Sequence, residues 1–488
     1  MVMCPYEVQL MELTLGDVAT LLNTRCAVPE RVITGYSIDS RSIGPGQLFF
    51  AMRGPRFDGH QFLAQAMERK AAGAVVENAF FEQAPPGLTP ALLPVPSPLG
   101  ALQHLGRCVR RKWGRPLVAV TGSTGKSTTK EMIAALLGRR FSVHKSAGNL
   151  NNHYGLPLTL LALEPEHDIA VVELAMSAAG EIAHLASIAE PETGVVTNVA
   201  PVHLEFFDSV ESIAKAKREL VENLSSREGP PIAVLNYDDP RVQRFAEGFE
   251  GKVVTFGMGP GADFQARWVK PGEGIGSEFR VMGPNLDADF VLPLPGRHNV
   301  QNALAAIAVA SSLDVPPVEM RRGLAEFQNM PQRGESLTLP GPVTIINDSY
   351  NSNPQAMVCM LETLRTWPGA RRRIVVAGEM LELGPQSPKL HLETGHKCAE
   401  ANLSWLIAVQ GEARFFLEGA VAAGLPPAQT RFFPEARLAG EFCRARLEPG
   451  DVVLVKGSRG VHLETVIEML QEQSRVESQE SRVGELKS

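Results

Sequence analysis

Residues 121–129, which read Thr-Gly-Ser-Thr-Gly-Lys-Ser-Thr-Thr, have the composition of a loop that binds phosphate. An apolar run precedes them and a helix-forming run follows, so the loop is expected to join a buried strand to a helix. Two glycines let the backbone curl until successive N–H groups point at an anion at the helix N-terminus. The lysine would reach the β- and γ-phosphates, and the serine after it would be a ligand of Mg²⁺. The candidate nucleotide contacts are therefore Gly122, Ser123, Thr124, Gly125, Lys126, Ser127 and Thr128.

The loop departs from the strict pattern, because Val120 stands where that pattern has its first glycine. The simpler interpretation is an ordinary glycine-rich turn, but Gly-Lys-Ser-Thr-Thr between a strand and a helix argues against it. Such a loop indicates a nucleotide without separating ligases from kinases, GTPases or motor ATPases. A GTPase is disfavoured, because no Asn-Lys-x-Asp sequence follows the loop.

Two further residues follow predicted strands, at the edge of a parallel sheet where ligands bind. Glu173 lies at the end of the predicted strand 168–174, and its carboxylate is placed to hold Mg²⁺. His203 follows the run 194–199. Glu173 could also be a plain strand-end acid, and a lone histidine is more often structural than catalytic.

Lys217 occupies an unusual position in a predicted helix that starts near Asp208, with Glu211 completing a capping-box-like start. Apolar residues recur along one face of this helix, and helical spacing places Lys217 in that stripe. Lys215 falls off it. A lysine that faces the interior needs a partner or a function, unless its side chain reaches back to the surface.

Strands and helices alternate around these residues, as expected for a parallel sheet covered by helices. Further helices should start near Ser127 and Asn299, and the remaining strand of this unit at 232–236. A region rich in glycine and proline, 257–296, suggests a small β excursion. A second alternation follows, with strands expected at 343–347, 373–377, 405–409 and 452–456.

The region before the phosphate loop has a different character. Short β-like runs at 32–37 and 48–52 accompany a helix-like run at 61–70, and the basic residues 107–115 read as a connector. We therefore predict an α/β protein of three domains. These are a small α/β domain at 1–112, a central parallel-sheet P-loop domain at 113–333, and a Rossmann-like α/β domain at 334–488 with a flexible tail from about 471.

Composition narrows the class of protein. An apolar fraction of 44% with 21% charged residues is typical of a soluble globular chain, and a net charge of −7 argues against nucleic acid as a partner. No apolar run approaches membrane-spanning length, and Glu7 and Glu12 lie where a signal peptide would be apolar. The six cysteines are scattered, as in reduced cytosolic proteins. We expect a cytoplasmic protein, a monomer, without membrane insertion.

Together the motifs resemble the Mur ligase family, which also includes folylpolyglutamate and cyanophycin synthetases. The phosphate loop, Val172-Glu-Leu174, the histidine motif 197–205 and Ala214-Lys-Ala-Lys-Arg-Glu219 are similar to family motifs. The resemblance implies that His203 and a carbamylated Lys217 join Ser127 and Glu173 around Mg²⁺, and that Lys126, Lys217 and His203 are catalytic. It assigns further ATP contacts to Asn299, Asn302, Arg333 and Asp348.

Other segments are similar to the family members that add D-alanyl-D-alanine. They are 347–354, which supplies the substrate-binding candidates Asn351 and Asn353, and 37–41, which supplies Ser37, Asp39, Ser40 and Arg41 for a uridine nucleotide. The resemblance implies an enzyme that uses ATP to join D-Ala-D-Ala to UDP-N-acetylmuramoyl-tripeptide through an acyl-phosphate. Another ligase of the family acting on a different acid, and a non-ligase NTPase or kinase, are the alternatives. Ala175-Met-Ser-Ala-Ala179 and Ala200-Pro201 depart from the family pattern near the second metal and the peptide.

Overall fold

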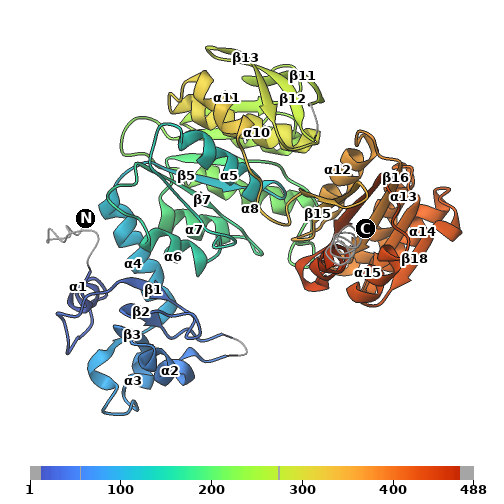
Figure 1. Cartoon of the computed structure of the whole chain (residues 1–488). Coiled ribbons are helices and arrows are strands. Elements are labelled where there is room, and N and C mark those ends of the chain that lie inside the picture. Colours follow the sequence, from blue (N-terminus) through green and yellow to red (C-terminus); the bar gives the residue numbers. More distant parts are fainter. Residues whose placement is uncertain (1–12, 55–56, 273–274, 473–488) are drawn as a thin grey trace, which may run out of the picture.

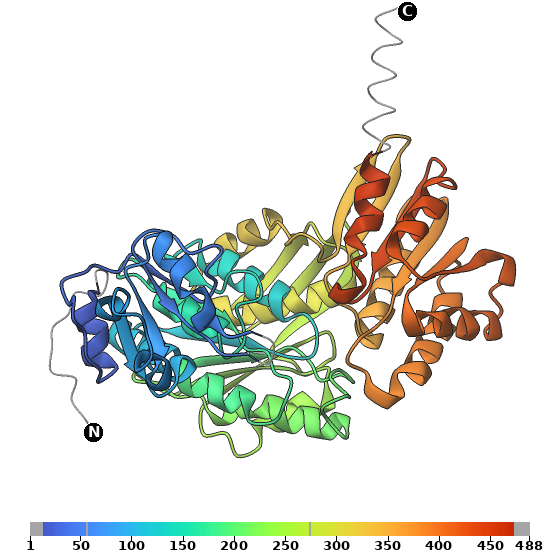
Figure 2. The ribbon, with the colours of Figure 1, turned by 90° about the horizontal axis from the view of Figure 1, so that it is seen from below.

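The computed structural model describes residues 13–54, 57–272 and 275–472. Glu7, Glu12 and the predicted tail beyond residue 472 lie outside these residues. The chain forms three sheets, and the part that carries the largest sheet lies between the other two parts (Figures 1 and 2). No helix in the described ranges has both the length and the apolar character needed to cross a membrane.

The N-terminal sheet is parallel, with its four strands in sequence order. Its strands are short and its inner residues apolar, and three small helices accompany it. The strands are β1 (Gly35–Ser37), β2 (Gln47–Phe50), β3 (Gly73–Glu77) and β4 (Leu92–Val95), and the helices are α1 (Leu15–Leu21), α2 (Leu63–Glu68) and α3 (Asn78–Phe81). The predicted helix at 61–70 is divided, because a 3₁₀ turn at Gly59–Phe62 precedes α2.

A long helix, α4 (Pro98–Trp113), leads from this sheet into the central part. The segment 107–115, predicted as a basic connector, is for the most part the last half of α4, so the connection is helical. Ser97 caps its start and Gly114, with φ +69°, ends it. The predicted boundary at residue 112 therefore falls within the last turn of a helix, and the division into three domains stays a prediction.

Arg110 fixes α4 to the central part. Its side chain is fully buried, and it donates to the backbone carbonyl of Ala189 at 2.7 Å and to both carboxylate oxygens of Glu192 at 2.9 Å. A buried charge is tolerated only when it is paired and hydrogen-bonded in this way. The helix that carries the N-terminal sheet is thus attached rigidly.

The central sheet has nine strands in the order β13-β12-β11-β10-β9-β8-β5-β7-β6. β11, β12 and β13 form an antiparallel extension of an otherwise parallel sheet, which is the predicted β excursion. The strands are β5 (Leu117–Thr121), β6 (Val143–Lys145), β7 (Ile169–Glu173), β8 (Thr193–Val196), β9 (Ile232–Asn236), β10 (Lys252–Gly257), β11 (Phe264–Pro271), β12 (Ser277–Gly283) and β13 (Leu286–Leu292). The predicted strand at 232–236 is confirmed at both ends.

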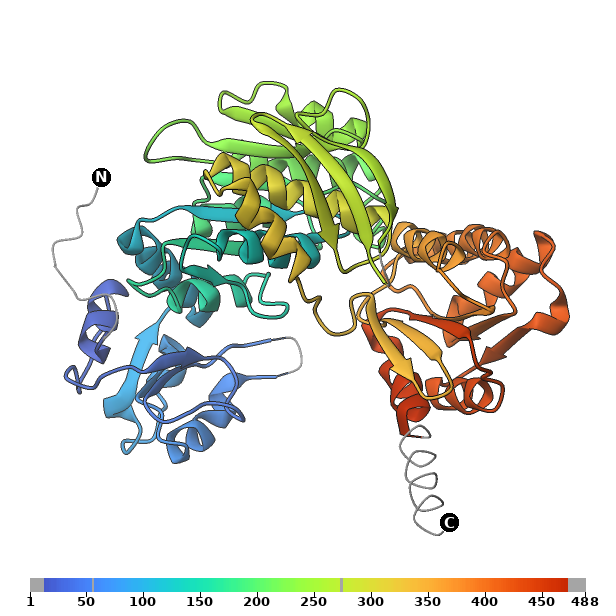
Figure 3. The same ribbon diagram turned by 45° about the horizontal axis from the view of Figure 1, so that its top comes forward.

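Helices cover both faces of this sheet (Figure 3). α10 is almost entirely buried and packs on α5, since its sequence is rich in alanine. α8 was predicted to be capped by Asp208, but it begins one residue later and Ser209 is its cap. The helices are α5 (Lys126–Leu137), α6 (Gly155–Leu161), α7 (Glu181–Ala189), α8 (Val210–Glu222), α9 (Pro240–Gln243), α10 (Arg297–Ser312) and α11 (Pro317–Ala325).

The C-terminal sheet has six strands in the order β14-β15-β19-β16-β17-β18, and β14 alone among them runs antiparallel. The strands are β14 (Glu335–Leu339), β15 (Val343–Asp348), β16 (Arg372–Gly378), β17 (Trp405–Val409), β18 (Thr430–Phe433) and β19 (Asp451–Lys456), and the helices are α12 (Pro354–Arg365), α13 (Ser387–Ala399), α14 (Arg414–Ala422) and α15 (Ala436–Arg444). The mixed α/β class with parallel sheets is confirmed.

Candidate active site

The phosphate loop joins β5 to α5 at the centre of the large sheet. β5 lies between β7 and β8, so the loop leaves the sheet at a topological switch point, where open α/β sheets bind ligands. Gly122 (φ +150°) and Gly125 (φ +77°) take backbone conformations that favour glycine. A Cβ on Gly122 would lie 1.9 Å from the Thr197 hydroxyl oxygen, and one on Gly125 would lie 2.4 Å from Oδ1 of Asn302. Any larger residue would therefore displace the walls of the loop.

The two residues that follow β8, Thr197 and Asn198, hydrogen-bond to the phosphate loop. The Asn198 side-chain oxygen accepts from the Thr124 N–H at 3.0 Å, and the Thr197 hydroxyl donates to the Thr124 carbonyl at 2.6 Å. Ser123 exchanges hydrogen bonds with the backbone of Ala200. These contacts hold the loop backbone in place. The sequence analysis includes Thr197 and Asn198 in the histidine motif but does not assign them to the phosphate loop.

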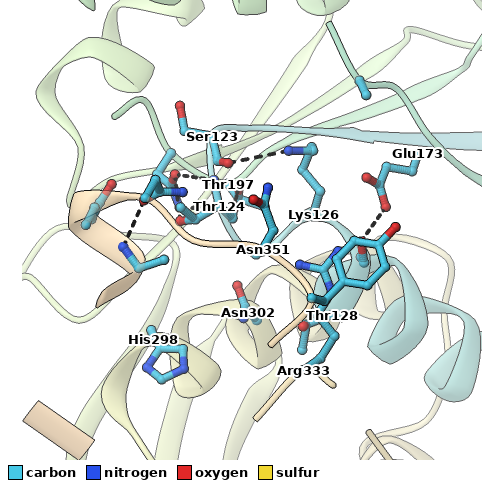
Figure 4. A pocket seen from close by; sticks show the side chains of 18 of the residues that line it. Ser123, Thr124, Lys126, Thr128, Glu173, Thr197, His298, Asn302, Arg333 and Asn351 are labelled. Atoms are coloured by element: carbon cyan, nitrogen blue, oxygen red, sulfur yellow. Dashed lines mark hydrogen bonds between the residues drawn. The ribbon is translucent and has the colours of Figure 1, made fainter. Parts of the chain in front are cut away.

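Lys126 and Glu173 lie on the same side of the phosphate loop (Figure 4). The Ser127 hydroxyl donates to Glu173 at 2.8 Å, and the Asn151 amide donates to the other Glu173 oxygen at 2.8 Å. Lys126 turns back to the Gly122 carbonyl at 2.9 Å. Burial lowers the pKa of Lys126, an effect that the nearby Glu173 carboxylate opposes. A hydroxyl beside a buried carboxylate is the oxygen donor set that Mg²⁺ prefers, so these residues fit that ion.

Lys217 faces the interior, as its helical position predicted. Its side chain is 2% exposed, whereas Lys215 on the same helix is exposed. Burial, and secondly the positive charge of Lys126, lowers the pKa of Lys217 well below its ordinary value. A neutral amine is therefore favoured at this position.

His203 lies at the boundary between the central and C-terminal parts. Its Nδ1 is 2.6 Å from Oε2 of Glu382, which lies in the loop after β16. This hydrogen bond lowers the pKa of Glu382. His203 lines the same cavity as Glu173. In the described part of the chain, however, no three His, Cys, Asp or Glu side chains converge as they would around a metal ion.

The remaining ATP candidates line this cavity too. Asn302 accepts from the Thr129 hydroxyl at 3.2 Å, and Asn299 donates to the Pro295 carbonyl. Arg333 lies 3.4 Å from the Ser127 hydroxyl, and the nearly buried Lys456 pairs with Asp348 at 2.6 Å. His298, which the sequence analysis does not assign, is half-buried in the lining of the cavity, and desolvation lowers its pKa to about 4.

The cavity has a volume of about 390 Å³ and is lined from both the central and the C-terminal parts. The structure brings together all the predicted ATP and metal candidates except Gly122 and Lys217, which lie outside the lining. Asn351 and Asn353 line the cavity, and Asn353 also caps α12. Ser37, Asp39, Ser40 and Arg41 lie elsewhere, on the N-terminal part, where Asp39 and Arg41 form an exposed ion pair of 2.7 Å.

The fold and the cavity define a class: an α/β protein whose phosphate loop is completed by a second α/β unit. Three family profiles match the chain, namely "Mur ligase family, catalytic domain" at 32–107, "Mur ligase middle domain" at 120–310 and "Mur ligase, glutamate ligase domain" at 332–459. The chain belongs to the Mur ligase family.

Curated relatives extend over nearly the whole chain. The UDP-N-acetylmuramoyl-tripeptide–D-alanyl-D-alanine ligases of Bacillus subtilis and Escherichia coli are 33% and 34% identical to it, over 94% and 95% of this chain and 98% and 99% of theirs. A MurF crystal structure from Acinetobacter baumannii superposes with a TM-score of 0.84 at 30% identity, covering 95% of this chain and all of that one. MurF ligase from Thermotoga maritima in complex with ADP has a TM-score of 0.78 at 29% identity, with 91% and 98% covered.

The contacts of Gly122 generate a prediction. Gly122→Ala should weaken ADP binding about tenfold to 100-fold, because the added methyl group and the positive φ strain the loop. Calorimetry with ADP measures the effect. Gly100→Ala is the control, since its Cβ would meet no atom closer than 3.6 Å. A folded Gly122→Ala protein with unchanged ADP affinity would show that the loop does not need this glycine.

Proposed function

We propose that this chain uses ATP to join D-alanyl-D-alanine to UDP-N-acetylmuramoyl-tripeptide, giving the pentapeptide precursor of peptidoglycan. Its relatives of similar length carry that activity in their names. The observation that carries the proposal is the shared cavity, in which the phosphate loop faces Arg333, at the junction of the two parts, and Asp348 and Lys456 of the C-terminal part. Such a cavity can hold ATP on one side and an amine acceptor on the other.

A free carboxylate is a poor electrophile, so amide formation requires its activation. In the proposed reaction the terminal carboxylate of the tripeptide attacks the γ-phosphorus of ATP, and the bond to ADP breaks. The amine of D-Ala-D-Ala then attacks the acyl carbon, phosphate leaves, and the amine loses a proton. Lys126 and the loop N–H groups would hold the transferred phosphoryl group in line and neutralise its charge.

The other cavity residues divide the rest of the work. Asn299 and Asn302 are proposed to contact adenine, Asp348 the ribose, and Arg333 the phosphates near Ser127. Ser127 and Glu173 would hold Mg²⁺, which when bound supplies positive charge to the phosphate oxygens. Because an acyl-phosphate hydrolyses readily, the two parts that line the cavity would also serve to exclude water.

Phosphate release tests the proposed function. The wild-type protein should release phosphate from ATP only when the UDP-tripeptide is present, and D-Ala-D-Ala should raise that rate and yield the pentapeptide. A ligase for another acid would respond to that acid instead. Phosphate release without any acid or amine would contradict the proposal and favour a plain NTPase. The monomeric state and cytoplasmic location stay predictions.

The N-terminal part is proposed to hold the uridine nucleotide through Asp39 and Arg41, together with Ser37 and Ser40. Arg41 is 82% exposed and free to meet a diphosphate, although it pairs with Asp39 in the structure. Arg41→Ala should raise KM for the UDP-tripeptide about tenfold, while KM for ATP stays unchanged, because a charge-assisted contact is lost. Steady-state kinetics measure both constants. If Arg41→Ala and the wild-type protein had the same KM for the UDP-tripeptide, the assignment would be contradicted.

Lys217 is proposed to react with CO₂ and to work as a carbamate. Its lowered pKa supplies the neutral amine, and a carbamate would replace a repelled ammonium by two oxygens of the type Mg²⁺ prefers. With His203, it would support a second ion near the acyl-phosphate.

The carbamate leads to an asymmetric prediction. Lys217→Ala should lose more activity than the roughly 10–100-fold that removal of an outer-shell metal partner costs, and acetate or formate should restore part of it. Lys215→Ala, on the exposed face of α8, is the control and should keep its activity. Wild-type protein in ¹³C-bicarbonate should show a carbamate carbon signal that Lys217→Ala lacks. Absence of that signal from active wild-type protein would refute the carbamate.

A further inference from the structure

Two arginines share the ring of Tyr350, a residue that lines the cavity. The Cζ atom of Arg333 is 4.0 Å from the ring centroid, and that of Arg459 is 5.5 Å from it. Arg333 also reaches Ser127 at the phosphate loop. The aromatic ring therefore connects the phosphate end of the cavity to a second guanidinium, which comes from the loop after β19.

The positive groups near the cavity differ in how they are engaged. Lys456 donates to Asp348 at 2.6 Å and to the Asn351 carbonyl at 2.8 Å. Arg333 is directed to the phosphate loop. Arg459 is exposed, and within the described residues its guanidinium forms neither an ion pair nor a hydrogen bond. Its full donor capacity is thus available to an anion.

The backbone that carries Arg459 is well fixed. Ser458 donates its N–H to the Glu379 carbonyl at 3.2 Å, and its hydroxyl accepts from the Leu381 N–H at 2.9 Å. Lys456, which lies three residues before Arg459, is held by its ion pair with Asp348. The position of the Arg459 Cα therefore does not depend on a ligand, and only its side chain has to adjust.

The acceptor of the proposed function is a dipeptide with an amine at one end and a carboxylate at the other. The amine must approach the acyl carbon beside the phosphate loop, and an extended dipeptide spans about 7 Å. Its carboxylate can then reach the guanidinium groups beside Tyr350, since the Cζ atoms of Arg333 and Arg459 lie 4.0 and 5.5 Å from the centroid of that ring. A guanidinium binds a carboxylate through two parallel N–H···O bonds, and stacking on an aromatic ring orients it.

We infer that Arg459 binds the terminal carboxylate of the acceptor dipeptide, and that Tyr350 positions its guanidinium. This inference rests on the proposed function. It makes Arg459 a residue that selects acceptors with a free carboxylate, and it keeps that negative charge apart from the phosphate that Lys126 and Arg333 serve.

Steady-state kinetics of Arg459→Gln test the assignment. KM for D-Ala-D-Ala should rise about 10- to 100-fold, the loss expected for a charge-assisted, bidentate contact, while KM for ATP and for the UDP-tripeptide stays within about twofold. The control is Arg414→Gln, since Arg414 is likewise exposed and stacked, 4.8 Å from Phe415, but its ring partner does not line the cavity, whereas Tyr350 does. It should leave every KM unchanged.

A second acceptor sharpens the test. The wild-type protein should strongly prefer D-Ala-D-Ala over its C-terminal amide, and Arg459→Gln should use the two about equally well. The inference is overturned if Arg459→Gln keeps the wild-type preference for the acid, or if KM rises for the UDP-tripeptide instead, which would assign Arg459 to the donor. Failure of the wild-type protein to ligate any dipeptide would be a different result, since it removes the proposed function itself.

Discussion

The close approach between the phosphate loop and its neighbours is the constraint on which the rest of the site depends. Gly122 and Gly125 leave no space for a side chain because Thr197, after β8, and Asn302, on α10, occupy it. Strand, loop and buried helix are therefore packed against each other before any phosphate arrives. This packing fixes the backbone of the loop before an anion binds, and α10 is placed against α5 for the same reason.

Charge is the second organising feature, and it is distributed unequally. Glu173 is 2% exposed and holds its orientation through Ser127 and Asn151, while Lys126 lies near enough to feel its charge. Lys217 is just as buried, but the charge it meets is that of Lys126, which is repulsive. Glu173 is thus held by two hydrogen-bond donors, whereas burial and the charge of Lys126 disfavour an ammonium at Lys217.

The sequence predicted features that depend on local periodicity or on short motifs. The strands at 232–236 and 405–409 were placed correctly at both ends because they are short apolar runs. The inward direction of Lys217 followed from helical phase alone. The helical nature of the basic end of α4 was not predicted, because Arg110 interrupts its apolar stripe and is paired there with Ala189 and Glu192, which lie far along the chain.

Side chains from loops were the hardest to foresee. Asn151 contacts Glu173, and Asn198 contacts the phosphate loop. The residue spacing in a loop does not indicate the direction of its side-chain amides. The same holds for His203, whose motif was recognised while its contact with Glu382 depends on the distant loop after β16. Residue propensity and periodicity predict single helices and strands. The contacts of these loop side chains, by contrast, depend on how helices and strands distant in the sequence pack together.

The meeting of the two parts has an electrostatic consequence. The chain carries a net charge of −7, yet Lys126, Arg333 and Lys456 line the cavity, and Arg459 lies beside the lining residue Tyr350. Asp348 pairs with Lys456, whereas Arg333 and Arg459 have no carboxylate partner among the described residues. A polyanion such as a nucleoside triphosphate would attract the basic groups of the central and C-terminal parts at once. Its binding energy would then favour the arrangement in which these two parts approach each other. A site divided between two parts in this way uses its own substrate to draw them together, and the same approach removes water from the reacting groups.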